Sequence, residues 1–508
     1  MSEIISTEEE SALESASAVF RDFYSVNPPF GHVGVEVNEA TGKLRYLTLE
    51  PSLTAEEVLV LEDLKEIIIE KMDIPLSVLR EEEAMDRYLK EQLQQAFKKF
   101  KEIVAKESEE KYIYYLKRDF LGYGKVDLLI RDENIEDISC NGTDTPIYIW
   151  HNKYESIPTN VKFESEKELA SIVTRLAYKS GQQISVSRPI VEGTLPMGYR
   201  VHLTLDEVSK RGSTFTIRKF KPNPYTIIDL IKFGTISPQI AAYLWVLIEN
   251  MCSVMISGAT ASGKTALLNS ICMFVMPEMK VVTIEEVQEL RLHENWIPMV
   301  TRPSFQSGVQ EITLFDLLKS ALRQRPDFII VGEVRGEEAY TLFQAIATGH
   351  GGLCTTHANN VESAIKRLMT KPMEIPEMML PLMNVFIQIN RVKLGDQIVR
   401  RAVTVAEIAE GTLGEDGPMI ERRFEWKAEK DAFTYNSPSI IGTDLFKLIS
   451  ENKHIPLEKL KEEQDRRVTI LRWMVKNNVS SYDDVANVVR SYYLTPDEVY
   501  NNARMDVS

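Results

Sequence analysis

Residues 258–265 have the types and the spacing that can hold a nucleotide phosphate. They fit the pattern G-x-x-x-x-G-K-[ST] and read Gly258, Ala259, Thr260, Ala261, Ser262, Gly263, Lys264 and Thr265. The two glycines let backbone N–H groups turn toward a phosphate, and the start of a helix adds partial positive charge there. Lys264 can bind the β- and γ-phosphates of ATP, and the Thr265 hydroxyl can bind Mg²⁺. We therefore expect ATP and Mg²⁺ as ligands.

The segments on either side of this loop are those that the motif requires. Residues 253–257, with Val254, Met255 and Ile256 at their centre, are predicted to form a strand, and residues 266–271 are predicted to form a helix. A chance glycine-rich turn is the alternative, and it would not need this strand–loop–helix context.

Two acids and a histidine also follow predicted strands directly. Glu285, Glu333 and His357 each come at the end of a short predicted strand. In open α/β sheets ligands collect at the carboxyl ends of the strands, so one sheet edge could present these side chains and Lys264 to a nucleotide. Glu333 could orient water or hold the water shell of a metal, and an exposed acid at a strand end is the plainer interpretation.

Composition narrows the class of protein. The chain has 508 residues, 44% of them hydrophobic, and a net charge of −16, which disfavours non-specific binding to nucleic acid or anionic lipid. Its four cysteines form no C-x-x-C pair, so we expect a reducing compartment and no structural zinc. The acidic N-terminus is unlike a signal peptide, and no apolar run is long enough for a membrane helix.

Changes in pattern along the chain predict five segments. Residues 1–110 are expected to form an accessory hairpin and a small helical bundle, and residues 111–225 a small α+β domain. A linker is expected at 226–235, after a proline-rich stretch. Strands and helices alternate over 236–410, which favours an α/β domain with a mainly parallel sheet, and 411–508 is expected to be a helical C-terminal subdomain.

Local signals place a few elements in the first segment. Two alternating runs between residues 33 and 49 predict a hairpin. Thr54 and Glu57 have the spacing of a capping box and are expected to open a helix to about Met72. A charged helix is expected at 81–107, with its charges on a solvated face.

Taken together, the motifs resemble those of the secretion-superfamily ATPases of type II and type IV secretion, type IV pili and archaella. The phosphate loop is followed by an acidic box at 283–289, a Walker B segment at 327–333 and a histidine box at 349–357. The family resemblance covers about residues 120–410. It implies an α/β fold with a RecA-like P-loop NTPase core, a smaller α+β N-terminal domain and an N-terminal helical accessory region.

The resemblance also assigns roles and shows departures. It makes Glu333 the catalytic glutamate, adds Glu285 and His357 to the site, and has Arg200 and Arg218 reach the nucleotide from the second N-terminal domain. Glu286 stands where the family's acidic box has Asp, and Gly332 stands where other NTPases have Asp.

The segments at 136–142, 187–193 and 492–496 look most like the archaeal branch, especially the archaellum motor ATPase. The resemblance implies a homohexamer that hydrolyses ATP to assemble or rotate a filament. Its partners would be a polytopic membrane platform protein and other archaellum or pilus components, with no nucleic acid. It would act in the cytoplasm, at the inner face of the membrane.

Other functions stay open at this point. An archaeal pilus or type II secretion ATPase would carry the same motifs. A RecA-like nucleic-acid motor would share the core but should carry basic, aromatic-rich loops. A nucleotide-gated scaffold would bind ATP without turnover, which the complete set of Lys264, Thr265 and Glu333 disfavours.

Overall fold

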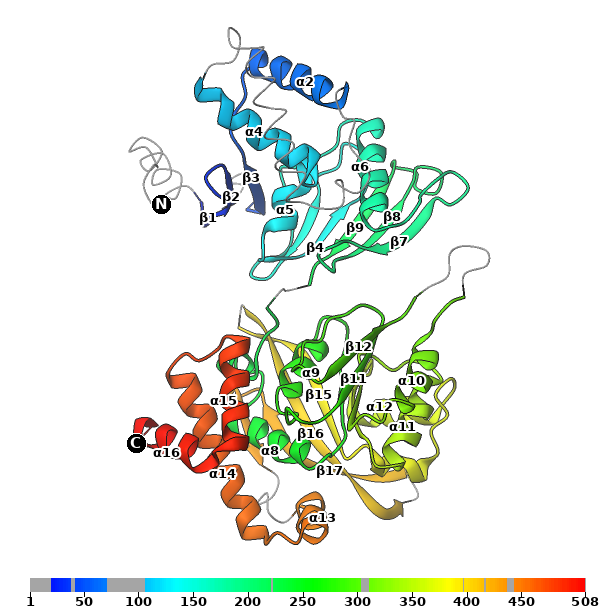
Figure 1. Cartoon of the computed structure of the whole chain (residues 1–508), viewed down its shortest axis with the longest axis vertical. Coiled ribbons are helices and arrows are strands. Elements are labelled where there is room, and N and C mark those ends of the chain that lie inside the picture. The colour runs from blue at the N-terminus through cyan, green and yellow to red at the C-terminus, as the bar shows by residue number, and fades with distance from the viewer. Residues whose placement is uncertain are drawn as a thin grey trace. The chain divides into compact units, whose positions relative to one another are not determined.

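A computed structural model of the chain shows two compact units, Met1–Lys221 and Pro222–Ser508. The structure describes residues 20–37, 42–70, 106–220, 223–302, 310–395, 397–414, 417–435 and 443–507. The two units are coloured blue to green and green to red in Figure 1. The charged helix expected at 81–107 lies outside the described residues, except for its last two positions, which begin α4.

The first unit is built on an antiparallel six-stranded sheet in the order β6-β5-β4-β9-β8-β7. Its strands are β4 (Ile135–Cys140), β5 (Tyr148–His151), β6 (Glu155–Pro158), β7 (Ile190–Thr194), β8 (Arg200–Thr204) and β9 (Thr214–Arg218). Buried and open positions alternate along β8 and β9, so one face of the sheet is apolar. Helix α6 (Glu166–Lys179) covers that face with Leu169, Val173 and Leu176, which recur at helical spacing.

The predicted hairpin is present but is not a separate domain. Strands β2 (Gly31–Val37) and β3 (Leu44–Leu49) pair antiparallel, and β1 (Asp22–Asn27), which was not predicted, pairs with β2. Val33, Val35 and Tyr46 are fully buried in the same core as the six-stranded sheet. The boundary expected near residue 110 is therefore not a break in packing, because the apolar face of the hairpin is buried by residues beyond it.

Two helices and a short turn complete the first unit. Helix α2 (Ala55–Glu70) begins at the predicted capping box, in which Thr54 N–H donates to Glu57 and Glu57 N–H donates to Thr54 Oγ1. Helix α4 (Lys106–Phe120) packs against α2 around Leu64 and Leu116. The chain then passes through η2 (Gly124–Val126) and α5 (Asp127–Arg131) into β4.

The second unit contains the mainly parallel sheet that the alternation of elements predicted. Nine strands lie in the order β12-β11-β13-β14-β10-β15-β16-β17-β18, and neighbours from β12 to β15 are parallel. The parallel strands are β10 (Val254–Ser257), β11 (Val281–Glu285), β12 (Trp296–Val300), β13 (Phe328–Val331), β14 (Gly351–Thr356) and β15 (Val385–Leu394). The remaining strands, β16 (Gln397–Gly414), β17 (Gly417–Lys427) and β18 (Ala432–Tyr435), extend one edge antiparallel.

Helices cover both faces of this sheet, so its central strands are buried throughout. Alternate residues serve the two faces: Val254 and Ile256 join one core cluster, and Met255 joins the other. On the Met255 side lie α10 (Leu314–Leu322), α11 (Glu338–Ala347) and α12 (Val361–Met369), which are gathered together in Figure 1. The turn η3 (Glu377–Leu382) belongs to the same cluster. The other side holds α7 (Ile227–Lys232), α8 (Pro238–Glu249), α9 (Lys264–Cys272), α13 (Asp444–Lys453), α14 (Leu457–Lys476), α15 (Tyr482–Leu494) and α16 (Pro496–Val507).

Two expectations about the second unit differ from the structure. The linker expected at 226–235 forms α7, because Thr226 and Asp229 make a capping box and Ile227 and Ile228 are fully buried. The segment expected to be helical from residue 411 first completes strands β16 to β18 and becomes helical only at α13. Within the described ranges, the structure contains no helix with the length and apolarity needed to cross a bilayer.

Candidate active site at the carboxyl edge of the large sheet

The loop between β10 and α9 has a backbone that its glycines make possible. Gly263 caps α9 in the left-handed region, at φ 96°, where residues with a side chain are strained. A Cβ atom on Gly258 would lie 2.4 Å from the carbonyl oxygen of Ile389 on β15. Glycine is therefore required at both positions for the loop to curl over the end of β10.

The interior of this loop fits a phosphate group. The hydroxyl of Ser262 is buried and has no hydrogen-bond partner in the described chain, so it can bind an added acceptor or donor. Thr265 lies in the first turn of α9, where a hydroxyl could take part in holding Mg²⁺. Ala259, Thr260 and Ala261 are exposed at the crest of the loop. The donors present thus fit the phosphates of a nucleotide and an accompanying Mg²⁺.

Lys264, His357 and Glu333 form one chain of contacts at the carboxyl edge of the sheet. Lys264 is 8% exposed, and its Nζ lies 3.0 Å from the carbonyl oxygen of Ala259 and 3.4 Å from Nδ1 of His357. Nε2 of His357 lies 3.1 Å from Oε1 of Glu333. These side chains follow β10, β13 and β14, which are neighbours in the sheet, so parallel pairing brings them to the same edge.

The protonation states of His357 and Glu333 follow from the groups around them. Burial lowers the pKa of His357, and the ammonium of Lys264 lowers it further, against an opposing effect of Glu333. Burial by itself would raise the pKa of Glu333, but hydrogen bonding and attraction to Arg335 outweigh it and the net shift is downward. A neutral His357 can accept from Lys264 at Nδ1 and donate to ionised Glu333 at Nε2.

Glu285 occupies a different environment at the end of β11. It is 3% exposed, and its Oε1 accepts hydrogen bonds from the backbone N–H groups of Glu289 and Leu290 at 2.9 and 3.1 Å. Burial raises the pKa of Glu285 to about 7. A Cβ atom on Gly332 would lie 3.3 Å from Cγ of Glu285, so the glycine at this point of the Walker B segment makes room for the acid.

Several residues that the sequence motifs did not identify also contact the site. Arg335 binds both carboxylate oxygens of Glu333, with Nε–Oε1 at 2.6 Å and Nη2–Oε2 at 2.9 Å. Arg367 on α12 donates to the carbonyl oxygen of His357, and Arg400 on β16 donates to that of Ala261. Arg335 stands two residues after Glu333 and could have been suspected from that spacing, whereas no local signal marks the other two arginines.

Arg200 and Arg218 belong to the first unit. They lie directly opposite each other on β8 and β9, and Arg218 also faces Asp137 on β4. The register therefore places two guanidinium groups side by side on one sheet. Their contact with a nucleotide stays a prediction.

Comparisons with known proteins agree with these motifs. A family described as Type II/IV secretion system protein matches residues 122–404. The "Uncharacterized protein MJ0900" of Methanocaldococcus jannaschii is 35% identical over 89% of this chain and 85% of its own length. The "Probable conjugal transfer protein TrbB" of Sinorhizobium fredii is 30% identical over 58% of this chain and 90% of its own length.

Solved structures with a similar fold include the Legionella pneumophila ATPase DotB, at 19% identity and a TM-score of 0.41 over 71% of this chain and 92% of that one. The pilus retraction motor PilT with bound ADP has 16% identity and a TM-score of 0.38 over 69% of this chain and 92% of that one.

Proposed function

The chain belongs to the family of type II/IV secretion system proteins and is an ATPase, and we propose that it powers the assembly of a pilus-like filament in archaea. The matched residues 122–404 contain the phosphate loop, the acidic box, Glu333 and the histidine box. The observation that carries the proposal is the contact chain from Lys264 through His357 to Glu333, which lies beside a loop whose donors fit phosphate.

In the proposed reaction, the residues at the carboxyl edge of the sheet have separate roles in binding and hydrolysing ATP. Lys264 and the loop N–H groups bind the phosphates, and Thr265 helps to hold Mg²⁺, directly or through its water shell. When bound, Mg²⁺ neutralises charge on the phosphates. Glu333 orients the attacking water and accepts its proton. His357 is neutral and hydrogen-bonded to both Glu333 and Lys264, and so holds these two side chains in position.

The finer parts of the proposal concern the assembly that the ATPase serves. We infer a homohexamer in which Arg200 and Arg218 complete the site, acting on a polytopic membrane platform protein of an archaellum. The archaeal character of the segments at 136–142, 187–193 and 492–496 supports this system. An archaeal pilus or type II secretion system is the second candidate, since the matching family is described as Type II/IV secretion system protein.

The first experiment compares two lysines at opposite ends of the same sheet. Lys264→Ala should weaken Mg·ATP binding about 10–100-fold, because it removes a charged hydrogen bond to phosphate. Lys280 precedes β11 at the amino edge, where its Nζ donates to the carbonyl oxygen of Gln324. Lys280→Ala is therefore the matched control and should bind Mg·ATP within about twofold of the parent chain. Equal binding by both variants would contradict the proposed site.

A second experiment tests the assembly and its partner class. Turnover per chain should rise with protein concentration and should not respond to added DNA or RNA. Cells of the source organism that carry Lys264→Ala should lose a surface filament, and electron microscopy shows whether archaella or pili are missing. Constant turnover over a wide dilution range would argue against a ring, and stimulation by nucleic acid would favour the RecA-like motor.

A further inference from the structure

Arg335 lies between the two acidic segments of the site. Its guanidinium binds both oxygens of Glu333, and Nη1 of the same group lies 3.4 Å from Oε1 of Glu286. Glu286 belongs to the acidic box after β11, and Glu333 belongs to the Walker B segment after β13, which is the neighbouring strand. One arginine thus contacts two carboxylates that come from different motifs.

This pairing opposes the role proposed for Glu333 as the base that accepts a proton from water. A carboxylate accepts a proton from water through a free lone pair on an oxygen that faces the water. In the structure, Arg335 holds both oxygens of Glu333 in a two-pronged contact, and His357 holds one of them as well. A two-pronged arginine contact is among the strongest pairings a carboxylate can make. Oε2 keeps one lone pair, but the guanidinium beside it makes Glu333 a weaker base. Glu333 therefore becomes a stronger base once Arg335 has turned away.

The surroundings of Arg335 allow that movement and supply a second partner. The Arg335 side chain is 50% exposed and that of Glu286 is 40% exposed, so neither is held by packing. The backbone of Arg335 is anchored instead, because its N–H and that of Gly336 donate to Oε1 of Glu338 at 2.6 and 2.7 Å. Glu338 is 7% exposed at the start of α11. A fixed backbone with an exposed guanidinium is suited to a side chain that exchanges between two acids.

We propose that Arg335 is a positioning residue that exchanges between Glu333 and Glu286, and that its transfer to Glu286 releases Glu333 for hydrolysis. The proposal rests on the proposed role of Glu333 as the base. It gives Glu286 a function as the second partner of Arg335, with no direct contact to the nucleotide. It also explains why Glu286 can stand where the acidic box of the family has Asp, since only the negative charge and the reach toward Arg335 matter.

The test is a double-variant measurement on the full-length protein. Steady-state ATP turnover is measured for Glu286→Gln, Arg335→Ala and the variant that carries both changes. Glu286→Gln removes the second partner, so Arg335 stays on Glu333, and kcat should fall at least about tenfold with little change in KM. Arg335→Ala makes the second partner unnecessary, so the double variant should recover kcat to within about threefold of the Arg335→Ala level. The kcat of Arg335→Ala is the reference for a Glu333 that no arginine holds, and it should exceed the kcat of Glu286→Gln.

Two controls separate this exchange from simpler effects. Arg323→Ala changes an exposed arginine that precedes β13 at the other end of the sheet and should leave kcat and KM unaltered. Mg·ATP titration and thermal unfolding of each variant establish that a loss of kcat is not a loss of binding or folding. Arg335→Lys keeps the charge without the two-pronged geometry, and we expect it to behave like Arg335→Ala in the Glu286→Gln background.

The outcomes distinguish failure of this proposal from failure of the proposed function. If Glu333→Gln loses turnover but the double variant is as slow as Glu286→Gln, Glu286 acts directly and the exchange is wrong while the ATPase assignment stands. If Arg335→Ala alone is as slow as Glu286→Gln, Arg335 is a static brace, and the exchange is again wrong. If Glu333→Gln keeps its turnover, the base itself has been assigned wrongly.

Discussion

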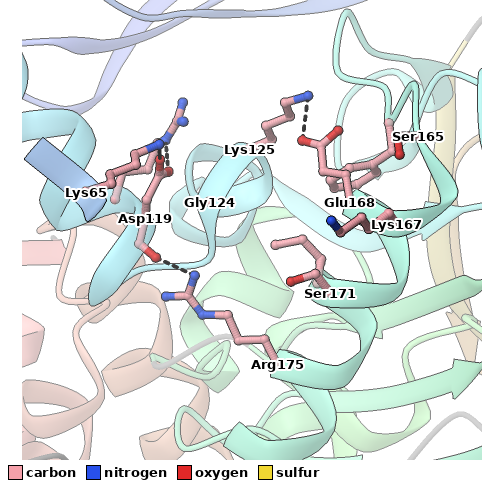
Figure 2. Close-up of a pocket in the computed structure, with 12 residues that line it drawn as sticks. Lys65, Asp119, Gly124, Lys125, Ser165, Lys167, Glu168, Ser171 and Arg175 are labelled. Carbon is pink, nitrogen blue, oxygen red and sulfur yellow. Dashed lines mark hydrogen bonds and ion pairs between the residues drawn. The ribbon is translucent and has the colours of Figure 1, made fainter. Parts of the chain in front are cut away.

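Two groups of basic side chains, one in each unit, differ in the hydrogen bonds that they make. The first lines a cavity of about 520 Å³ between α4, η2 and α6, shown in Figure 2. The second is the phosphate loop and its neighbours at the carboxyl edge of the large sheet. By count of cations alone the cavity looks the better anion site, since it is lined by Lys65, Arg118, Lys125, Lys167 and Arg175.

Most cations of the cavity already bind groups of the protein. Lys65 pairs with Asp119 at 2.6 Å, and Lys125 pairs with Glu168 at 2.7 Å, as the dashed lines of Figure 2 show. Arg175 donates to the backbone carbonyl oxygens of Asp119 and Phe120 at the end of α4 and to that of Gly122 just after it, so it caps the end of that helix. These interactions hold α4, η2 and α6 together.

At the sheet edge, by contrast, the hydrogen-bonding capacity of the polar groups is not fully satisfied by the protein. Ser262 has a buried hydroxyl without a partner in the described chain, and the glycines of the loop keep its backbone open. Lys264 contacts the carbonyl oxygen of Ala259 and Nδ1 of His357 at the same edge. The comparison shows that an anion site is identified by donors that the fold leaves available, more than by the number of cations around a cavity.

The largest expected effect concerns two arginines of the first unit that lie outside the cavity. If Arg200 and Arg218 reach the γ-phosphate, the double variant Arg200→Ala, Arg218→Ala should lose on the order of 10³–10⁵ in turnover, as for arginine fingers in other NTPases. The matched control is His202→Ala, Thr216→Ala, because these two residues form a neighbouring cross-strand pair on the same face. Near-normal turnover of the arginine variant would leave the first unit without a part in the chemistry.

The next effect concerns the base at the sheet edge. Glu333→Gln should lower hydrolysis by on the order of 10²–10⁴, the usual contribution of a positioned base, while Mg·ATP binding stays similar or becomes tighter. Glu337→Gln, at an exposed position just before α11, is the control and should change neither quantity. If Glu285→Gln lost turnover and Glu333→Gln did not, the base would belong to the acidic box.

A smaller effect concerns the pH dependence of folding. The pKa of Glu285 is raised to about 7 in the folded chain, above its ordinary value, so its contribution to stability is present at low pH and is lost as pH rises through 7. From pH 5 to pH 8 the free energy of unfolding of the parent should fall by about 2 kcal/mol more than that of Glu285→Gln. Thermal unfolding at both pH values measures this, with Glu294→Gln as an exposed control on the same segment. Parallel pH dependence of all three proteins would contradict the raised pKa.

The smallest expected effect lies in the cavity, where it tests the comparison from the other side. Lys125→Ala breaks a partly exposed ion pair with Glu168, so it should cost less than about 1 kcal/mol of stability. KM for ATP should stay within about twofold of the parent, because the cavity cations are used in packing. A large rise in KM would show that the cavity takes part in nucleotide binding. The distinction between a structural cavity and a nucleotide site at the sheet edge would then be wrong.

Much of the fold could be predicted because its signals are local. The phosphate loop, the capping box at Thr54 and Glu57, and the hairpin within residues 33–49 are each encoded in a few neighbouring residues. The parallel sheet followed from the alternation of strands and helices. The separate accessory domain and the linker at 226–235 were expected for the same local reasons, and there packing between distant residues gave a different result.

By itself, the sequence determined which side chains end the parallel strands, and hence that Lys264, Glu333 and His357 lie at one edge. It did so because parallel strands must all present their carboxyl ends in the same direction. Only the tertiary structure decided which of these side chains touch and what else touches them. Glu286 and Arg335 are 49 residues apart, and Ala261 and Arg400 are 139 apart. Such contacts depend on strand order, register and rotamers, for which no short stretch of sequence carries a signal.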